Sequence, residues 1–161
     1  MDTDMTFRQM RRFKQQITDD ECFAIRRSAS RGTLAVIGAG GYPYALPINF
    51  VFHDGKIFFH CAKTGHKIDA IRLCDKASFC VISEPLKEEN SWWYHVTSVI
   101  CFGKIKEIND PEQKDRLLRT LGSKYFPEGY DIDADMRKNS SQAIVLEFSI
   151  DHMTGKKVRE K

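Results

Sequence analysis

FFHCAKTGHK, residues 58–67, joins an apolar run to a short turn that contains glycine and two basic residues. The aromatic start of this stretch predicts a strand, and the residues after Thr64 predict a helix over 65–74. The cationic side chains of the turn therefore surround the beginning of that helix. This junction is the first candidate for a binding site.

The charge at the start of the predicted 65–74 helix favours an anion. A helix N-terminus carries about half a positive charge, so His66 and Lys67 each cost about 0.3–1 kcal/mol per full charge there. The other predicted helices, over 19–30 and from Asp110 to near Lys124, begin with acidic residues instead. A bound phosphate would remove the conflict by pairing with Lys67 and accepting from backbone N–H groups. The alternative is a solvated basic turn.

Outward from this stretch, short segments rich in β-branched and aromatic residues predict an antiparallel β body. Thr18 and Glu21 form a capping box that begins the 19–30 helix. The turn-forming segments 38–41 and 53–55 separate the first three strands. Strands are predicted at 33–37, 44–52, 56–61, 78–83, 96–108 and 143–150.

The predicted fold class is mainly β with peripheral helices (α+β). Six antiparallel strands with three helices at the rim favour a small closed or half-open barrel, since only one strand-helix-strand unit could supply a parallel crossover. At 161 residues the chain is expected to be a single domain over 1–161, in which residues 1–16 form a partly flexible tail.

Composition restricts the class of protein further. A hydrophobic content of 42% argues against disorder, and the apolar runs are too short to span a bilayer. The polar, basic residues 1–16 do not resemble a signal peptide, so a cytoplasmic location is expected. The mild net charge of +3 predicts no nucleic-acid surface, and the short apolar runs predict no membrane partner. The five cysteines lack a framework spacing, so no disulfide is expected.

Pro47 lies within a predicted strand, where it removes a ladder donor. We expect the ladder to be interrupted at this point, which would free the backbone groups of Ile48 and Asn49 for a planar polar ligand. The alternative is an ordinary edge strand, in which proline is tolerated.

The segment 98–102 (SVICF) is apolar at nearly every position, so both faces of that strand should be covered. One face would meet the core, and the other a ligand or a second subunit. Trp92 and Trp93 add aromatic surface of the kind found at interfaces, and together with Val99 they are expected to line an exposed groove. The alternative is a core strand that is covered within one chain.

Five blocks of the sequence resemble a known family. In order they are MRR at 10–12, LPINF at 46–50, FHCAKTGHK at 59–67, SVICFG at 98–103 and HMTGK at 152–156. This order resembles the 5-nitroimidazole resistance branch of the pyridoxamine 5'-phosphate oxidase-like flavoproteins over nearly the whole chain. The Arg-x-x-x-Leu-Lys strand motif of the true oxidases is absent, so the resemblance does not extend to oxidation of vitamin B6 compounds.

The resemblance implies a split β-barrel that forms a homodimer and binds FMN, with FAD as the alternative, in a groove between subunits. By analogy Lys67, with His66 and Lys63, would bind the phosphate, while residues 60–62 would run beside the ribityl chain and ring. The implied cofactor-binding residues are Pro47, Ile48, Asn49, His60, Cys61, Ala62, Lys63, Gly65, His66, Lys67, Ser98 and Val99.

The implied activity is that of an FMN-dependent oxidoreductase that reduces a nitroaromatic, 5-nitroimidazole-like compound or a similar small planar acceptor. The electrons would come from a nicotinamide as transient donor or from another reductant. His60 is the candidate catalytic residue, because an imidazole can supply a proton near neutral pH. The alternative is a histidine that only hydrogen-bonds the flavin or a backbone carbonyl. A zinc site is not expected, because the nearby histidines and cysteines lack zinc-ligand spacing.

Two other functions remain open at this stage. One is a flavin-binding redox sensor or flavin store without robust turnover. The other is a binding module for a different ligand that carries a phosphate.

Overall fold

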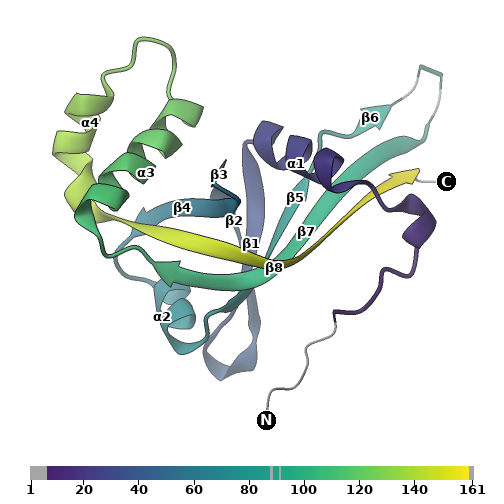
Figure 1. Cartoon of the computed structure of the whole chain (residues 1–161), viewed down its shortest axis with the longest axis horizontal. Helices are drawn as coiled ribbons and strands as arrows, with labels where there is room; N and C mark the ends of the chain where they lie inside the picture. The colour runs from purple at the N-terminus through teal and green to yellow at the C-terminus, as the bar shows by residue number, and fades with distance from the viewer. Residues whose placement is uncertain (1–6, 88, 91, 160–161) are drawn as a thin grey trace.

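The computed structural model describes residues 7–87, 89–90 and 92–159, which form one curved sheet with helices around it (Figure 1). The α-helices are α1 (Asp19–Ser28), α2 (His66–Leu73), α3 (Pro111–Tyr125) and α4 (Ile132–Asn139). The strands are β1 (Arg31–Ile37), β2 (Pro43–Asn49), β3 (Val51–His53), β4 (Lys56–Ala62), β5 (Lys76–Ile82), β6 (Leu86–Lys87), β7 (Tyr94–Glu107) and β8 (Ala143–Arg159).

The sheet has eight strands in the order β2-β1-β5-β7-β8-β4-β3, and β6 pairs with β7. All pairings between described strands are antiparallel, as the sequence predicts. The long strands β7 and β8 run through the middle of the molecule, with the α3–α4 hairpin at one end and β6 at the other (Figure 1). The architecture is a half-barrel, mainly antiparallel β, with peripheral helices.

Local sequence signals account for most element boundaries. Thr18 and Glu21 form the expected capping box at α1, and Asp110 caps α3 by accepting from Gln113 N–H at 2.6 Å. Asp54 and Gly55 both have positive φ, at 46° and 75°, which is the backbone of a tight turn between β3 and β4.

The main core fills the inner face of the sheet. Phe79 is fully buried and makes edge-on ring contacts with Phe50 at 4.9 Å and Phe59 at 5.1 Å. A Cβ added to Gly32 would come within 2.7 Å of the Phe79 ring. The absence of a side chain at Gly32 therefore leaves the space that Phe79 occupies.

A second, smaller core lies where α3 packs on the sheet, and its members come from α3, β3, β4, β8 and the residue after β7. They are Val51, Phe58, Ile108, Leu117, Leu121 and Val145. Paired residues on neighbouring strands point to the same face, and Phe58 pairs with Glu147, which pairs with Lys106. α3 thus covers the outer face at the β4–β8 end of the sheet.

Rows of paired residues continue on the outer face beyond α3. One row is Pro47, Thr33, Cys80, Ile100 and Thr154. A second row is Ala45, Ala35, Ser78, Phe102 and His152. Every residue in both rows is exposed or half-buried, so this part of the sheet, which we call the bare face, has no layer over it comparable with α3.

Several expectations from the sequence need correction. The predicted strand over 44–52 is two strands, because Phe50 ends the pairing of β2 with β1 and β3 pairs with β4 instead. α4 was not predicted, and β8 continues to Arg159 rather than ending at 150. The expected partly flexible tail over 1–16 stays a prediction: Gln16 forms a bridge with Lys156, and residues 1–6 lie outside the described part.

The expected interruption at Pro47 is also absent. The β1–β2 register runs without a shift from Pro43 to Asn49, and Pro47 stands opposite Thr33. β2 is the edge strand of the sheet, where proline is tolerated because one side of the strand has no ladder. The alternative of an ordinary edge strand is the correct one.

The structure of β7 shows which faces of segment 98–102 are covered within one chain. Val99 and Cys101 are fully buried in the core, whereas Ile100 and Phe102 are 37% and 41% exposed. One chain therefore does not cover both faces of this strand. Val99 faces the core and does not line an exposed groove, contrary to the expectation, while Trp92 is exposed and stacks on Trp93 at 3.8 Å.

No helix within the described residues is long and apolar enough to cross a membrane. All five cysteines are free thiols.

Candidate functional site

The junction of β4 and α2 brings together three of the predicted site residues. His60 and Cys61 are consecutive on β4 and therefore point to opposite faces of the sheet. The Lys67 ammonium of α2 acts electrostatically on both residues, lowering the pKa of the Cys61 thiol and of the His60 ring.

The His60 imidazole is held in its neutral form. Although the residue as a whole is exposed, its ring lies against the wall of a cavity, and loss of hydration there is the main cause that lowers its pKa. The Lys67 ammonium lowers the pKa further, and the Asp135 carboxylate acts in the opposite direction. At neutral pH the ring can therefore donate one hydrogen bond and accept another.

The Cys61 thiol is not a nucleophile in this setting. Burial raises its pKa, and the charge of Lys67 only partly offsets this effect. A thiol with a raised pKa stays protonated at neutral pH.

The beginning of α2 differs from that of the other described α-helices. Side chains of Thr18, Asp110 and Asp131 cap α1, α3 and α4, whereas Gly65 at the N-cap of α2 offers no side chain. Gly65 has a φ of 124°, which is a glycine conformation. The first N–H groups of α2 are consequently left for an external acceptor.

The charge pattern of α2 is less inverted than the sequence suggests. His66 and Lys67 occupy its first two positions, but Asp69 also lies in the first turn and Arg72 in the last. The cationic character is therefore confined to the very start of the helix. Among the described ion pairs, none includes Lys67, so no carboxylate neutralises its ammonium.

The His66 side chain contacts other residues than those of the His60, Cys61 and Lys67 cluster. Its ring lies 4.5 Å from the ring of Tyr44, and its Nε2 is close to where a Cβ of Gly38 would lie. It packs on the β1–β2 hairpin. Ala62, Lys63 and Gly65 are exposed in the turn between β4 and α2.

Asn49 reaches the site from β2. Its Oδ1 accepts a hydrogen bond from Arg31 Nε at 3.2 Å, and it lines the same cavity as His60. Ile48, by contrast, is buried in the core, so only its backbone could contact a ligand. Pro47 and Asn49 lie on the outer face with His60.

The backbone beside Asn49 is fixed by α3. Tyr125 Oη accepts from Phe50 N–H at 2.8 Å and lies 2.6 Å from the carbonyl oxygens of Phe50 and Ser30. Lys124 Nζ donates to Ala29 and Phe50 carbonyls, at 2.7 and 3.0 Å, and burial lowers its pKa. These bonds satisfy the polar groups where the chain leaves β2 for β3.

Ser98 and Val99 have no described contact with His60 or Lys67 within one chain. Ser98 pairs with Ile82 and Lys156 in the middle of the sheet, and Val99 is buried. No described hydrogen bond or ion pair links either residue to His60 or Lys67.

The cavity beside His60 has a volume of about 390 Å³. It lies between β4, the end of β2 and the α3–α4 hairpin, and most of its lining comes from α3 and α4. Apart from Asn49 and His60, the lining residues are not among the site residues predicted from the sequence, because α4 was not expected. The apolar pair Ile132 and Met136, spaced four apart after the N-cap Asp131, was the available signal.

A family model described as pyridoxamine 5'-phosphate oxidase matches residues 18–157. A search of curated proteins finds no significant match. Solved structures match the fold, among them a candidate 5-nitroimidazole antibiotic resistance protein from Bacteroides thetaiotaomicron. It is 21% identical with a TM-score of 0.75, and the match covers 88% of this chain and 86% of that one.

Two other similar structures bind different groups. An FAD-binding protein from Mesorhizobium loti is 19% identical with a TM-score of 0.66, over 89% of this chain and 96% of that one. A haem storage protein from Vibrio cholerae is 13% identical with a TM-score of 0.65, over 86% of this chain and 94% of that one. At these identities the structural likeness establishes the split-barrel fold, and the family match covers most of the chain. The chain therefore belongs to the pyridoxamine 5'-phosphate oxidase family of split β-barrel proteins.

Proposed function

We propose that this protein is an FMN-dependent oxidoreductase that reduces a small planar acceptor, a nitroaromatic such as a 5-nitroimidazole being the leading class. Membership of the family supports a flavin, and the similar structure from B. thetaiotaomicron supports the acceptor class. FAD is the alternative cofactor, in view of the protein from M. loti.

The observation that carries the proposal is the cationic, uncapped beginning of α2. Lys67 has no carboxylate partner among the described residues, and the first backbone N–H groups of α2 have no side-chain cap. A phosphate monoester fits both needs, because it accepts from backbone N–H groups and pairs with an ammonium. The donor set therefore fits the phosphate end of FMN.

The remaining predicted residues fit the rest of such a ligand. Lys63 and Gly65 stand in the exposed turn beside the phosphate position, and residues 60–62 lead from it along the outer edge of β4. Asn49 and His60 lie on the outer face of the sheet, where they would orient the polar edge of the flavin ring. Pro47 borders the same position, and Ser98 would come from the other subunit.

When bound, the flavin would supply hydride and single-electron transfer. The side chains of this protein bind and orient the reactants and control protons. The neutral His60 ring can hold a proton at one nitrogen beside a developing anion on the acceptor. Reduction of a nitro group to a nitroso group by NADH consumes one further proton and releases one water, and the His60 ring could pass that proton from solvent by accepting it at one nitrogen while donating from the other.

The purified protein tests this function directly. A yellow protein with close to one FMN per chain is expected, with bleaching by NADH or NADPH and reoxidation when a 5-nitroimidazole is added under anaerobic conditions. Bleaching without reoxidation by the acceptor would instead indicate a redox sensor or flavin store. A protein that binds no flavin would refute the proposal.

We also propose a homodimer formed through the bare face. Ile100 and Phe102 are exposed apolar side chains on this face, where the Phe7 ring packs on Phe102 at 5.6 Å and small residues such as Ala35 and Ser78 leave room for a second copy. Such a dimer would bring Ser98 of one subunit towards the His60 group of the other.

The dimer is expected to bury well over about 1,000 Å² in total. Light scattering at micromolar concentration should give twice the protomer mass of 18.6 kDa. Ile100→Lys should shift the mass towards one protomer, because a charge would be buried without a partner. The exposed Leu73→Lys serves as the control and should stay dimeric. A wild-type protein with the mass of a single protomer would contradict the dimer.

A further inference from the structure

The cavity under the α3–α4 hairpin has the size of a ligand pocket. Its volume of about 390 Å³ lies within the range of pockets that hold small organic ligands. It borders His60 and Asn49, but its other walls belong to elements outside the predicted flavin site. The cavity therefore offers room beside the flavin position.

The walls are mostly apolar and suit the faces of a flat ring. The apolar wall residues are Leu118, Leu121, Phe126, Ile132, Met136 and Ala143.

Polar groups meet in the cavity from two sides. His60 and Asn49 come from the sheet, and Asp135 and Asn139 come from α4. Asp135 Oδ1 accepts from Asn139 Nδ2 at 2.8 Å and from the Tyr130 hydroxyl at 3.4 Å. Asp135 Oδ2 receives no hydrogen bond from a described residue, so it keeps its capacity to accept one.

Charge restricts the ligand further. With His60 neutral, Asp135 is the only lining residue that carries a formal charge. A carboxylate in a largely apolar cavity repels an anionic ligand and favours one that donates a hydrogen bond. The cavity is therefore complementary to a flat ring that bears an N–H group.

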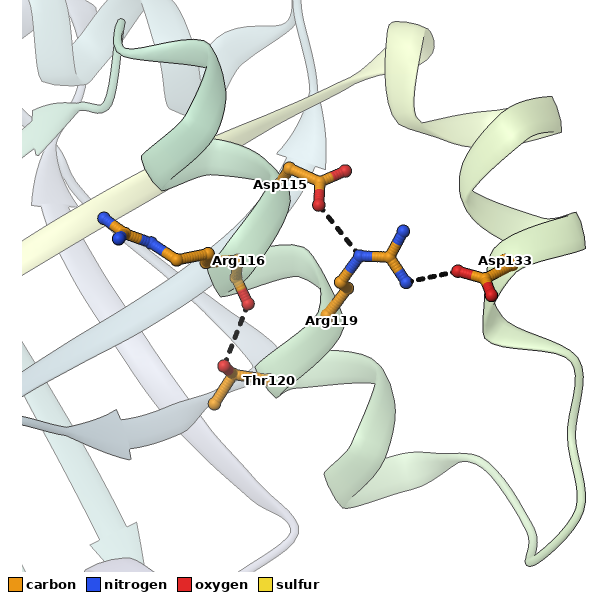
Figure 2. Close-up of polar contacts among 5 residues, drawn as sticks. All are labelled: Asp115, Arg116, Arg119, Thr120 and Asp133. Atoms are coloured by element: carbon orange, nitrogen blue, oxygen red, sulfur yellow. Dashed lines mark hydrogen bonds and ion pairs between the residues drawn. The ribbon is translucent and has the colours of Figure 1, made fainter.

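An ion-pair cluster links the two helices of the hairpin that forms the cavity. Arg119 on α3 bonds Asp115 through Nε at 2.8 Å and Asp133 of α4 through its Nη1, as Figure 2 shows. Arg119 thereby links α4 to α3 at the surface, where such exposed pairs contribute little to stability. This contact lowers the pKa of Asp133, so the pair is ionised at neutral pH.

We infer that this cavity is the acceptor pocket, selective for small planar nitrogen heterocycles with a ring N–H, which Asp135 accepts. The inference rests on the proposed function, because it places the acceptor beside the flavin position at His60.

The test uses two redox-inert probes, benzimidazole and 1-methylbenzimidazole, on the FMN-loaded protein with ¹³C-labelled methionine methyl groups. Met136 lines the cavity, whereas Met10 and Met153 do not. Saturable movement of the Met136 signal alone is expected with benzimidazole, and binding at least fivefold weaker with the N-methyl analogue. Movement of Met10 or Met153 without Met136 would overturn the inference.

Two variants locate the probe. Ala143→Phe fills the cavity and should weaken benzimidazole binding at least tenfold while FMN affinity stays within threefold. Ala134→Phe is the matched control, since Ala134 is exposed on α4 and does not line the cavity, and it should bind normally. Loss of FMN affinity in Ala143→Phe alone would assign the cavity to the flavin and overturn the inference.

Asp135→Leu keeps roughly the size of the side chain, removes both acceptor oxygens and tests selectivity without filling the cavity. The preference for benzimidazole over its N-methyl analogue should fall below twofold, and an unchanged preference would refute the role of Asp135. A wild-type protein that binds no FMN would refute the proposed function. An FMN-loaded protein whose Met136 signal does not respond would refute the acceptor pocket alone.

Discussion

Lys67→Ala is expected to weaken FMN binding by about ten- to a hundredfold. The substitution removes a charge-assisted hydrogen bond to the phosphate, an interaction worth about 1.5–3 kcal/mol. Lys63, in the exposed turn beside the phosphate position, could replace only part of this interaction. Fluorescence titration of the flavin-free protein with FMN measures the effect.

Two comparison variants test whether the loss of affinity comes from the charge at position 67. Lys67→Arg keeps the charge and should recover part of the affinity, whereas Lys14→Ala, at an exposed position before α1, should bind FMN as the wild type does. An affinity for FMN within threefold of wild type in Lys67→Ala would place the phosphate elsewhere.

The His60 pKa offers a second readout of the same substitution. Lys67 lowers this pKa in the folded protein, so its removal should raise the pKa towards the ordinary histidine value. The effect of burial remains, and the recovery should therefore be incomplete. Binding of inorganic phosphate beside Lys67 should shift the pKa in the same upward direction. NMR titration of the His60 Cε1 proton measures both shifts, and a fall in the pKa would contradict the geometry.

Phe79→Ala is expected to cost about 3–5 kcal/mol of unfolding free energy, because it opens a large cavity in a fully packed core. Phe79 is fully buried between Phe50 and Phe59, and Gly32 leaves no side chain to fill the space. Leu73→Ala is the surface control, since Leu73 is 75% exposed, and should change stability by less than about 0.5 kcal/mol. Urea unfolding at a fixed protomer concentration is the measurement, because a dimer links stability to concentration.

Gly32 and Phe79 should show strong coupling. Gly32→Ala alone is expected to destabilise by about 1–3 kcal/mol, because its new Cβ would meet the Phe79 ring. In a Phe79→Leu background the smaller side chain relieves this contact, and Gly32→Ala should cost clearly less. Additive effects in the double-mutant cycle would show that the two residues do not share this space.

The sequence by itself determined the local structure around the site. Thr18 and Asp110 mark helix starts that the structure confirms, because each cap depends on a side chain three residues from its partner. The turn at Asp54 and Gly55 and the strand that ends in the 58–67 stretch are local features for the same reason. The antiparallel half-barrel followed from the order of these elements.

The tertiary structure decided what depends on contacts between distant segments. Phe50 ends β2 because Tyr125 and Lys124 of α3 bind its backbone groups, and no local pattern announces that partner. Val99 faces the core while Ile100 faces outwards, a choice set by the register between β5 and β7 and not by their shared apolar character. The cavity beside His60 exists because α4 folds back on α3, where Met136 is buried and Asp133 pairs with Arg119, so it depends on contacts between residues on separate helices.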